Sequence, residues 1–142
     1  MRHNIQWPAA PAALLALLTA DLQTLSAQGD STSRPKPAGA DVLDANTYVG
    51  WQQYRLLCDR CHGEEARGTS FGPDLLPAFK EGGTIASADA FRAFITAGRP
   101  DKGMPPASKI GLSPEHFDGI YRYLHGRSNG TYAGGRPVRG KD

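Results

Sequence analysis

The two cysteines of this chain lie three positions apart and are followed directly by a histidine, as Cys58, Cys61 and His62. Two thiols at this spacing can add to the two vinyl groups of a haem and hold it by thioether bonds. The imidazole that follows then lies beneath the iron and can bind it as an axial ligand. The motif therefore predicts one covalently attached haem c, with His62 as one ligand of its iron.

Three other kinds of site also contain Cys-x-x-Cys. A thioredoxin-like redox site needs a βαβ setting, and the sequence shows no pattern for one. A structural zinc site usually takes four ligands, and the chain has no second cysteine pair. A disulfide across a two-residue gap is strained and easily reduced. The histidine next to the second cysteine favours haem.

Met104 is the expected second ligand of the iron. Apart from the initiator it is the only methionine, and it lies in a loop between Gly103 and Pro105. Core methionines usually lie on a helix face instead. A thioether is a soft ligand that suits ferrous haem, and His/Met ligation raises the potential of a cytochrome. The alternative is an apolar contact made by the loop.

Four other side chains could compete with Met104 for the iron. His116 and His125 lie near the start and the end of a predicted helix, where surface histidines are common. Lys102 and Lys109 could bind iron only in the deprotonated form, which an exposed lysine rarely adopts. We therefore expect none of the four to be a ligand.

An all-α fold is expected to position these residues. Apolar residues repeat at helical spacing over 46–58, 88–97 and 114–124. Ser87 and Ser113 suit the N-cap positions of the second and third helices. No run of residues predicts a strand. The Gly- and Pro-rich stretch between the first two helices is too long for a structureless loop unless a bound group orders it.

Composition divides the chain into four parts. Residues 1–27 contain a short apolar run and are interpreted as an export signal peptide, because a membrane span needs roughly 20 apolar residues. A retained N-terminal anchor is the alternative. Residues 28–44 are rich in Ser, Pro and Gly and predict a flexible linker. A compact cytochrome domain is expected over 45–126, followed by a basic, Gly-rich tail over 127–142.

The cellular compartment and the net charge limit the functions that this protein can have. Covalent haem attachment in bacteria takes place outside the cytoplasmic membrane, which agrees with an export signal and predicts a periplasmic protein. The formal net charge is only +2, and no basic stripe alternates with aromatic residues. Nucleic-acid binding is therefore not expected. Stable membrane insertion is expected only if the signal is retained.

The order of the motifs resembles the class I (monohaem) cytochromes c. That family shows a helix before Cys-x-x-Cys-His, then a Gly-Pro-x-Leu segment, a Met-Pro loop and a last helix ending in Tyr-Leu. The corresponding residues here are Cys58 to His62, Gly72 to Leu75, Met104 with Pro105, and Tyr123 with Leu124. The resemblance implies a cytochrome c fold, with three main helices and Gly/Pro-rich loops around the haem.

The resemblance also implies roles for individual residues. The carbonyl of Pro73 should accept a hydrogen bond from the ring of His62 and fix its orientation. The first and last helices should cross closely at four positions: Gly50, Tyr54, Ile120 and Tyr123. No clear match exists for the donors to the haem propionates, for which the candidates are Trp51, Arg60, Arg67 and Arg99.

The expected function is electron transfer, and the protein is not expected to be an enzyme. Its partners should be a donor dehydrogenase and an acceptor oxidase or cytochrome, in transient complexes. The segments 127–130 and 135–137 are similar to the tails of periplasmic cytochromes that accept electrons from quinoprotein (PQQ-dependent) alcohol dehydrogenases. One alternative is a five-coordinate haem sensor or gas-binding protein, in which Met104 stays off the iron. A di-haem peroxidase would need a second attachment motif.

Overall fold

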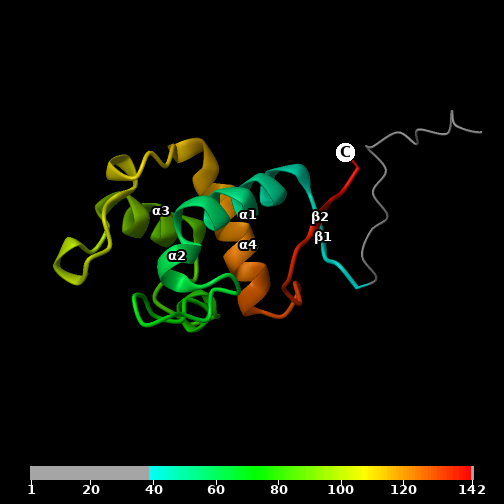
Figure 1. Ribbon diagram of the computed structural model, residues 1–142, viewed down its shortest axis with the longest axis horizontal. Coiled ribbons are helices and arrows are strands. Elements are labelled where there is room, and N and C mark those ends of the chain that lie inside the picture. The colour runs from blue at the N-terminus through cyan, green and yellow to red at the C-terminus, as the bar shows by residue number, and fades with distance from the viewer. Residues whose placement is uncertain (1–38, 142) are drawn as a thin grey trace, which may run out of the picture. The chain divides into compact units, whose positions relative to one another are not determined.

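The structure is a computed structural model that describes residues 39–141. Most of this part is helical or irregular (Figure 1). The predicted export signal and most of the predicted linker lie outside the described residues. Within them, no helix is both long and apolar enough to cross a membrane. The elements in chain order are β1 Val42–Leu43, α1 Ala45–Leu57, α2 Asp59–His62, the 3-10 helix η1 Leu76–Phe79, α3 Ala88–Ala97, the 3-10 helices η2 Pro100–Lys102, η3 Ala107–Lys109 and η4 Pro114–His116, α4 Phe117–Ser128, and β2 Val138–Arg139.

Helix α1 leads directly into the cysteine motif and is fixed at its start by Asp44. The Asp44 carboxylate accepts hydrogen bonds from the hydroxyl of Thr47 at 2.7 Å and from its backbone amide at 2.9 Å. These bonds lower the pKa of the Asp44 carboxyl below its usual value, because they favour the charged form. At the other end, the amide of Cys58 donates to the carbonyl of Tyr54 at 2.8 Å, and α2 follows.

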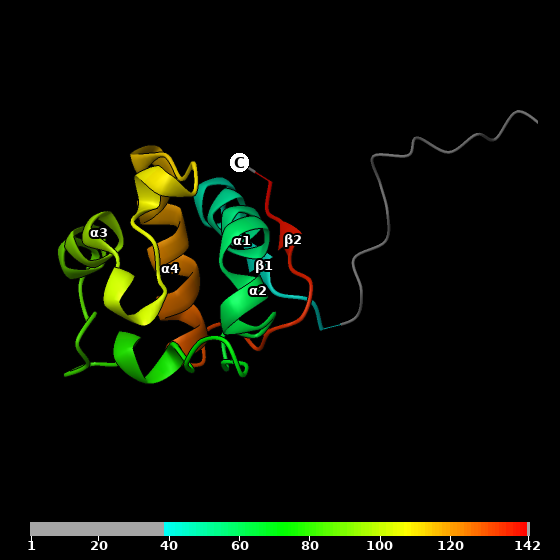
Figure 2. The same ribbon diagram turned by 60° about the vertical axis from the view of Figure 1, so that its left-hand side comes forward.

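Helices α1 and α4 cross at very short range (Figures 1 and 2). A Cβ atom placed on Gly50 would overlap the carbonyl group of Gly119 and the amide of Ile120. One turn further along α1, the ring of Tyr54 lies 5.6 Å from the ring of Tyr123. The contacts implied by the resemblance are therefore present. Gly119 completes the crossing and was not anticipated.

Helix α3 has the predicted boundaries, because both of its ends are set by local chemistry. The hydroxyl oxygen of Ser87 accepts a hydrogen bond from the amide of Ala90 at 3.1 Å. Gly98 follows the helix with φ of 65°, in the left-handed region that glycine adopts easily. The buried face of α3 carries Phe91 and Ile95, which belong to the core.

The third predicted helix, 114–124, differs from the structure at both ends. Ser113 forms no side-chain cap; a 3-10 turn comes first, and α4 itself begins at Phe117. The turn is closed by a bond from the amide of His116 to the carbonyl of Ser113 at 3.1 Å. The helix also continues through Gly126 to Ser128. Gly126 lies within the helix and allows the ring of Tyr132 to pack closely against it, because a Cβ there would overlap that ring.

The C-terminal segment packs against the helices and is not separated from them. The amide of Tyr132 donates to the carbonyl of Gly126 at 3.0 Å, and the amide of Gly134 donates to the Asp41 carboxylate at 3.0 Å. Strand β2 then pairs with β1 in parallel (Figure 2). The structure thus differs from the division into linker, domain and tail, since residues on both sides of 45–126 join the same unit.

Candidate haem site

A single apolar pocket collects three of the predicted site residues. Cys58, His62 and Met104 all line this pocket. Cys58 follows the last residue of α1, His62 lies in α2, and Met104 lies in a loop far along the sequence. Hydrophobic side chains make up almost all of the remaining lining, and such a lining fits a flat, largely apolar macrocycle. These side chains are Tyr54, Leu75, Phe79, Ile85, Phe91, Phe94, Ile95, Leu112, Ile120 and Leu124.

His62 is buried and its ring has a fixed orientation. Only 9% of the residue is exposed, and Nδ1 lies 3.0 Å from the carbonyl oxygen of Pro73. A proline carbonyl can only accept, so Nδ1 carries the proton and donates. The Nε2 lone pair is then free to bind a metal. The contact that the resemblance implied between Pro73 and His62 is present.

The loop that carries Pro73 lies unusually close to the cysteine motif. A Cβ on Gly72 would lie 2.9 Å from the Cys61 carbonyl oxygen and 3.0 Å from Nδ1 of His62, so glycine is required there. The hydroxyl of Thr69 donates to the same Cys61 carbonyl at 2.5 Å and accepts from the amide of Phe71 at 3.0 Å. The loop is thus tied to the turn of chain that holds Cys61 and His62.

The two cysteines lie one helical turn apart and form no disulfide. The amide of Cys61 donates to the carbonyl of Cys58 at 3.1 Å. Cys58 is largely covered by the pocket, and this burial raises the pKa of its thiol to about 12, whereas Cys61 is exposed. Among residues 39–141, no three His, Cys, Asp or Glu side chains gather as they do around a zinc ion.

Met104 is presented by a tight loop between α3 and η3. The backbone amide of Arg99 donates to the Met104 carbonyl at 2.8 Å, and the amide of Met104 donates back to Arg99 at 3.0 Å. Gly98 allows the loop to fold over the end of α3, since a Cβ there would lie 2.5 Å from the nitrogen of Pro106. Gly103 adopts φ of 80°, which closes the turn. The Met104 side chain is partly buried against the core.

The four competing ligands do not line this pocket. The ring of His125 stacks on that of Tyr121, with centroids 5.5 Å apart. His116 lies on η4, outside the pocket. Lys102 and Lys109 are exposed.

The four propionate candidates also lie outside the apolar lining. The ring of Trp51 packs on Tyr48 at 5.3 Å, and Arg99 pairs with its neighbour Asp101 across 3.7 Å. Arg60 and Arg67 are exposed. Apolar residues of the irregular segments also line the pocket and were not predicted, among them Phe79, Ile85 and Leu112. Isolated apolar residues within a Gly- and Pro-rich stretch were the available signal.

Comparison with known proteins gives matches over most of this unit. Residues 45–124 match the family model described as cytochrome C oxidase, cbb3-type, subunit III. Cytochrome c-555 of Methylococcus capsulatus is 34% identical over 100 residues, which cover 70% of this chain and 76% of that protein. The dehydrogenase subunit of the quinone alcohol dehydrogenase of Acetobacter aceti is 31% identical over 83 residues. These cover 58% of this chain and 11% of that subunit.

A solved structure has the same fold. The crystal structure of the c-type cytochrome XoxG from Methylobacterium extorquens AM1 superimposes with a TM-score of 0.61 at 23% identity. The match covers 72% of this chain and 63% of that one. The all-α cytochrome c fold expected from the sequence is confirmed.

Proposed function

Since the chain belongs to the cytochrome c family, whose members carry a covalently bound haem c, we propose that it is a periplasmic one-electron carrier with a single haem. Cys58 and Cys61 hold the haem by thioether bonds. His62 and Met104 would be the two residues that hold its iron. The observation that supports this assignment is that Cys58, His62 and Met104 line one apolar pocket.

Each of these residues has a distinct part in electron transfer. When bound, the haem supplies a one-electron exchange between ferric and ferrous iron. The hydrogen bond from His62 to Pro73 holds the imidazole in one orientation and one tautomer. The apolar lining excludes water and, with the soft sulfur of Met104, favours the less charged ferrous state. Nothing in this scheme transforms a substrate.

The electron donor in this proposal is a dehydrogenase, with a quinoprotein alcohol dehydrogenase as the leading choice. Two features support it: the tail sequence described above and the similarity to part of a quinone alcohol dehydrogenase subunit. The acceptor is a terminal oxidase or another cytochrome. The periplasmic location rests on the export pattern of residues 1–27 and on the family's covalent haem.

Replacing Met104 by alanine tests the proposal against the sensor alternative. We expect Met104→Ala to lose the sulfur-to-iron absorption band, to bind carbon monoxide in the ferrous form and to have a lower reduction potential, because a soft ligand is removed. Leu112→Ala is the control, since it also shortens a side chain that lines the pocket but leaves the sulfur in place. An unchanged spectrum in Met104→Ala would mean that Met104 does not bind the iron. It would favour the alternative of a five-coordinate haem sensor.

Phe71 is the exposed residue that we expect partners to contact. Phe71 is 81% exposed. It lies in the loop that Thr69 ties to the Cys61 carbonyl. Burying one aromatic anchor in an interface contributes about 1 kcal/mol or more. We expect Phe71→Ala to slow reduction by a purified quinoprotein alcohol dehydrogenase several-fold, at unchanged reduction potential. Leu56→Ala, which alters an exposed apolar residue of α1, is the control, and equal rates in both variants contradict the proposal.

A further inference from the structure

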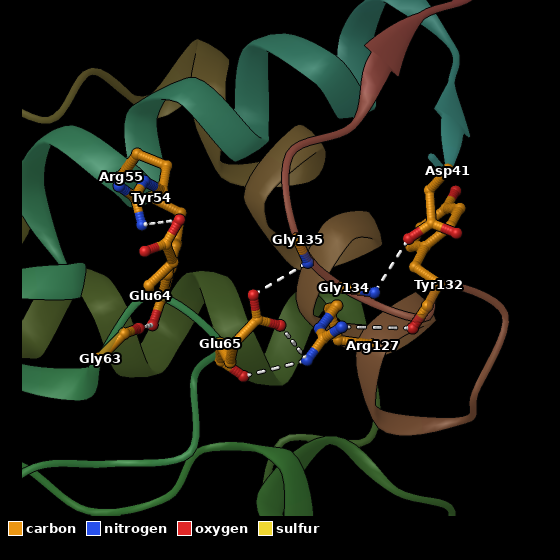
Figure 3. A network of polar contacts seen from close by, with 10 residues as sticks. All are labelled: Asp41, Tyr54, Arg55, Gly63, Glu64, Glu65, Arg127, Tyr132, Gly134 and Gly135. Atoms are coloured by element: carbon orange, nitrogen blue, oxygen red, sulfur yellow. Dashed lines mark hydrogen bonds and ion pairs between the residues drawn. The ribbon is translucent and has the colours of Figure 1, made fainter. Parts of the chain in front are cut away.

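Arg127 is buried near the end of α4 and forms an ion pair with Glu65. Its side chain is only 4% exposed, and Nη2 lies 2.7 Å from a carboxylate oxygen of Glu65 (Figure 3). Nη2 also donates to the Glu65 carbonyl at 3.3 Å, and Nη1 donates to the Tyr132 carbonyl at 3.5 Å. The Glu65 side chain is 39% exposed, so the charge left without compensation when the pair is broken is that of the buried arginine.

The same Glu65 side chain also holds residues 129–141, which we call the C-terminal strap. The amide of Gly135 donates to the second carboxylate oxygen of Glu65 at 2.9 Å. Next to it, the amide of Gly134 donates to Asp41 (Figure 3). Glu65 therefore joins the strap and α4 to the loop that follows the cysteine motif.

That loop begins at His62 and returns to it through Pro73. Ala66, the residue after Glu65, is fully buried and adopts φ of 57°, which is disfavoured for a residue with a side chain. Its carbonyl accepts a hydrogen bond from the amide of Leu75 at 2.9 Å. This bond fixes the position of the second half of the loop, which runs back toward His62 and contains Pro73. The amide of Ala66 donates to the carbonyl of Gly63 at 3.0 Å, and the neighbouring Glu65 is tied to Arg127 and the strap.

We propose that Glu65, Arg127 and the strap are positioning residues for the haem ligand. The ion pair fixes the backbone at Ala66, the bond from Leu75 to Ala66 fixes the returning loop, and the loop holds the Pro73 carbonyl against His62. This inference rests on the proposed function, because it assumes that His62 binds the iron. It gives the C-terminal segment a role inside the protein that is separate from partner docking.

Gly134 offers a test that changes no charge. A Cβ at this position would overlap both Nη1 of Arg127 and the Glu65 carboxylate, so Gly134→Ala forces the ion pair apart. Gly130→Ala is the matched control. Gly130 lies in the same strap at a positive φ of 83°, against 113° at Gly134, and a Cβ there meets nothing within 4 Å. Both variants place alanine at a positive φ, and only Gly134→Ala adds the collision with the ion pair.

The experiment compares the two variants as holoproteins by amide hydrogen exchange and by haem reduction potential. In Gly134→Ala we expect the amides of Gly68 and Leu75 to exchange about tenfold faster or more than in Gly130→Ala. The reduction potential should shift in Gly134→Ala alone, because the hydrogen bond to His62 is weakened. The amide of Ile95, in the core of α3, should exchange equally in both.

Three results would overturn the inference. Equal exchange at Gly68 and Leu75 in the two variants would mean that the ion pair does not hold the loop. Faster amide exchange with an unchanged reduction potential would mean that the position of the loop does not affect His62. Faster exchange at Ile95 as well would show general destabilisation. Failure of the proposed function is distinguishable, because it appears in the spectrum of the unmodified protein before any variant is compared.

Discussion

His62→Ala is expected to abolish stable haem incorporation. Among the histidines of residues 39–141, His62 alone lines the apolar pocket, and its bond to the Pro73 carbonyl leaves Nε2 free for the iron. Without the imidazole, the apolar lining cannot supply a replacement nitrogen ligand. The measurement is the haem content of purified protein from a host that matures c-type haem, by absorption and by haem staining of denatured protein.

His116→Ala is the matched control for this substitution. His116 lies outside the pocket, so its replacement should leave haem content unchanged. The account of the site is contradicted if His62→Ala yields an intact, six-coordinate holoprotein. Loss of haem from both variants would mean that histidine content, and not the position of His62, determines maturation.

Gly50→Ala is expected to destabilise the holoprotein by about 3 kcal/mol or more, because the added methyl group overlaps the backbone of α4. Helix propensity alone predicts that Gly50→Ala stabilises the protein, since alanine in a helix interior is favoured over glycine by about 1 kcal/mol. The direction of the change therefore decides between close backbone crossing and simple propensity. Urea unfolding followed by circular dichroism measures it.

Gln52→Ala provides the comparison for Gly50→Ala. Gln52 lies on the exposed side of the same helix, so its replacement should change the free energy of unfolding by less than about 0.5 kcal/mol. A raised urea midpoint in Gly50→Ala would contradict the crossing geometry. The crossing matters for function because α4 carries Ile120 and Leu124, two of the residues that line the pocket.

Local chemistry explains which parts of the fold could be predicted. The ends of α3 are set by Ser87 and Gly98, which adjoin the helix in sequence, and the predicted range 88–97 is the one observed. Ser113 has the same local pattern at the next helix, but a 3-10 turn takes the place of a cap. The partners of Asp41 and Glu65 in the strap lie far along the sequence, so no local pattern could reveal them.

The candidate site divides in the same way. Residue type and spacing singled out Cys58, His62 and Met104, and the structure brings them to one pocket. The Pro73 contact followed from the family resemblance alone, because nothing in the sequence shows that this carbonyl faces His62. The sequence prediction places Arg127 at the start of a basic, Gly-rich tail. Its burial depends on the strap folding back over α4, which only the three-dimensional structure shows.

The visible to far-red absorption spectrum of the protein tests the central claim most directly. A protein matured with c-type haem should show a reduced c-type spectrum and, in the oxidised form, the far-red band of sulfur bound to ferric iron. Both features together are the result expected for one haem ligated by His62 and Met104. A c-type spectrum without the far-red band would contradict the claim, because Met104 would not be bound to the iron.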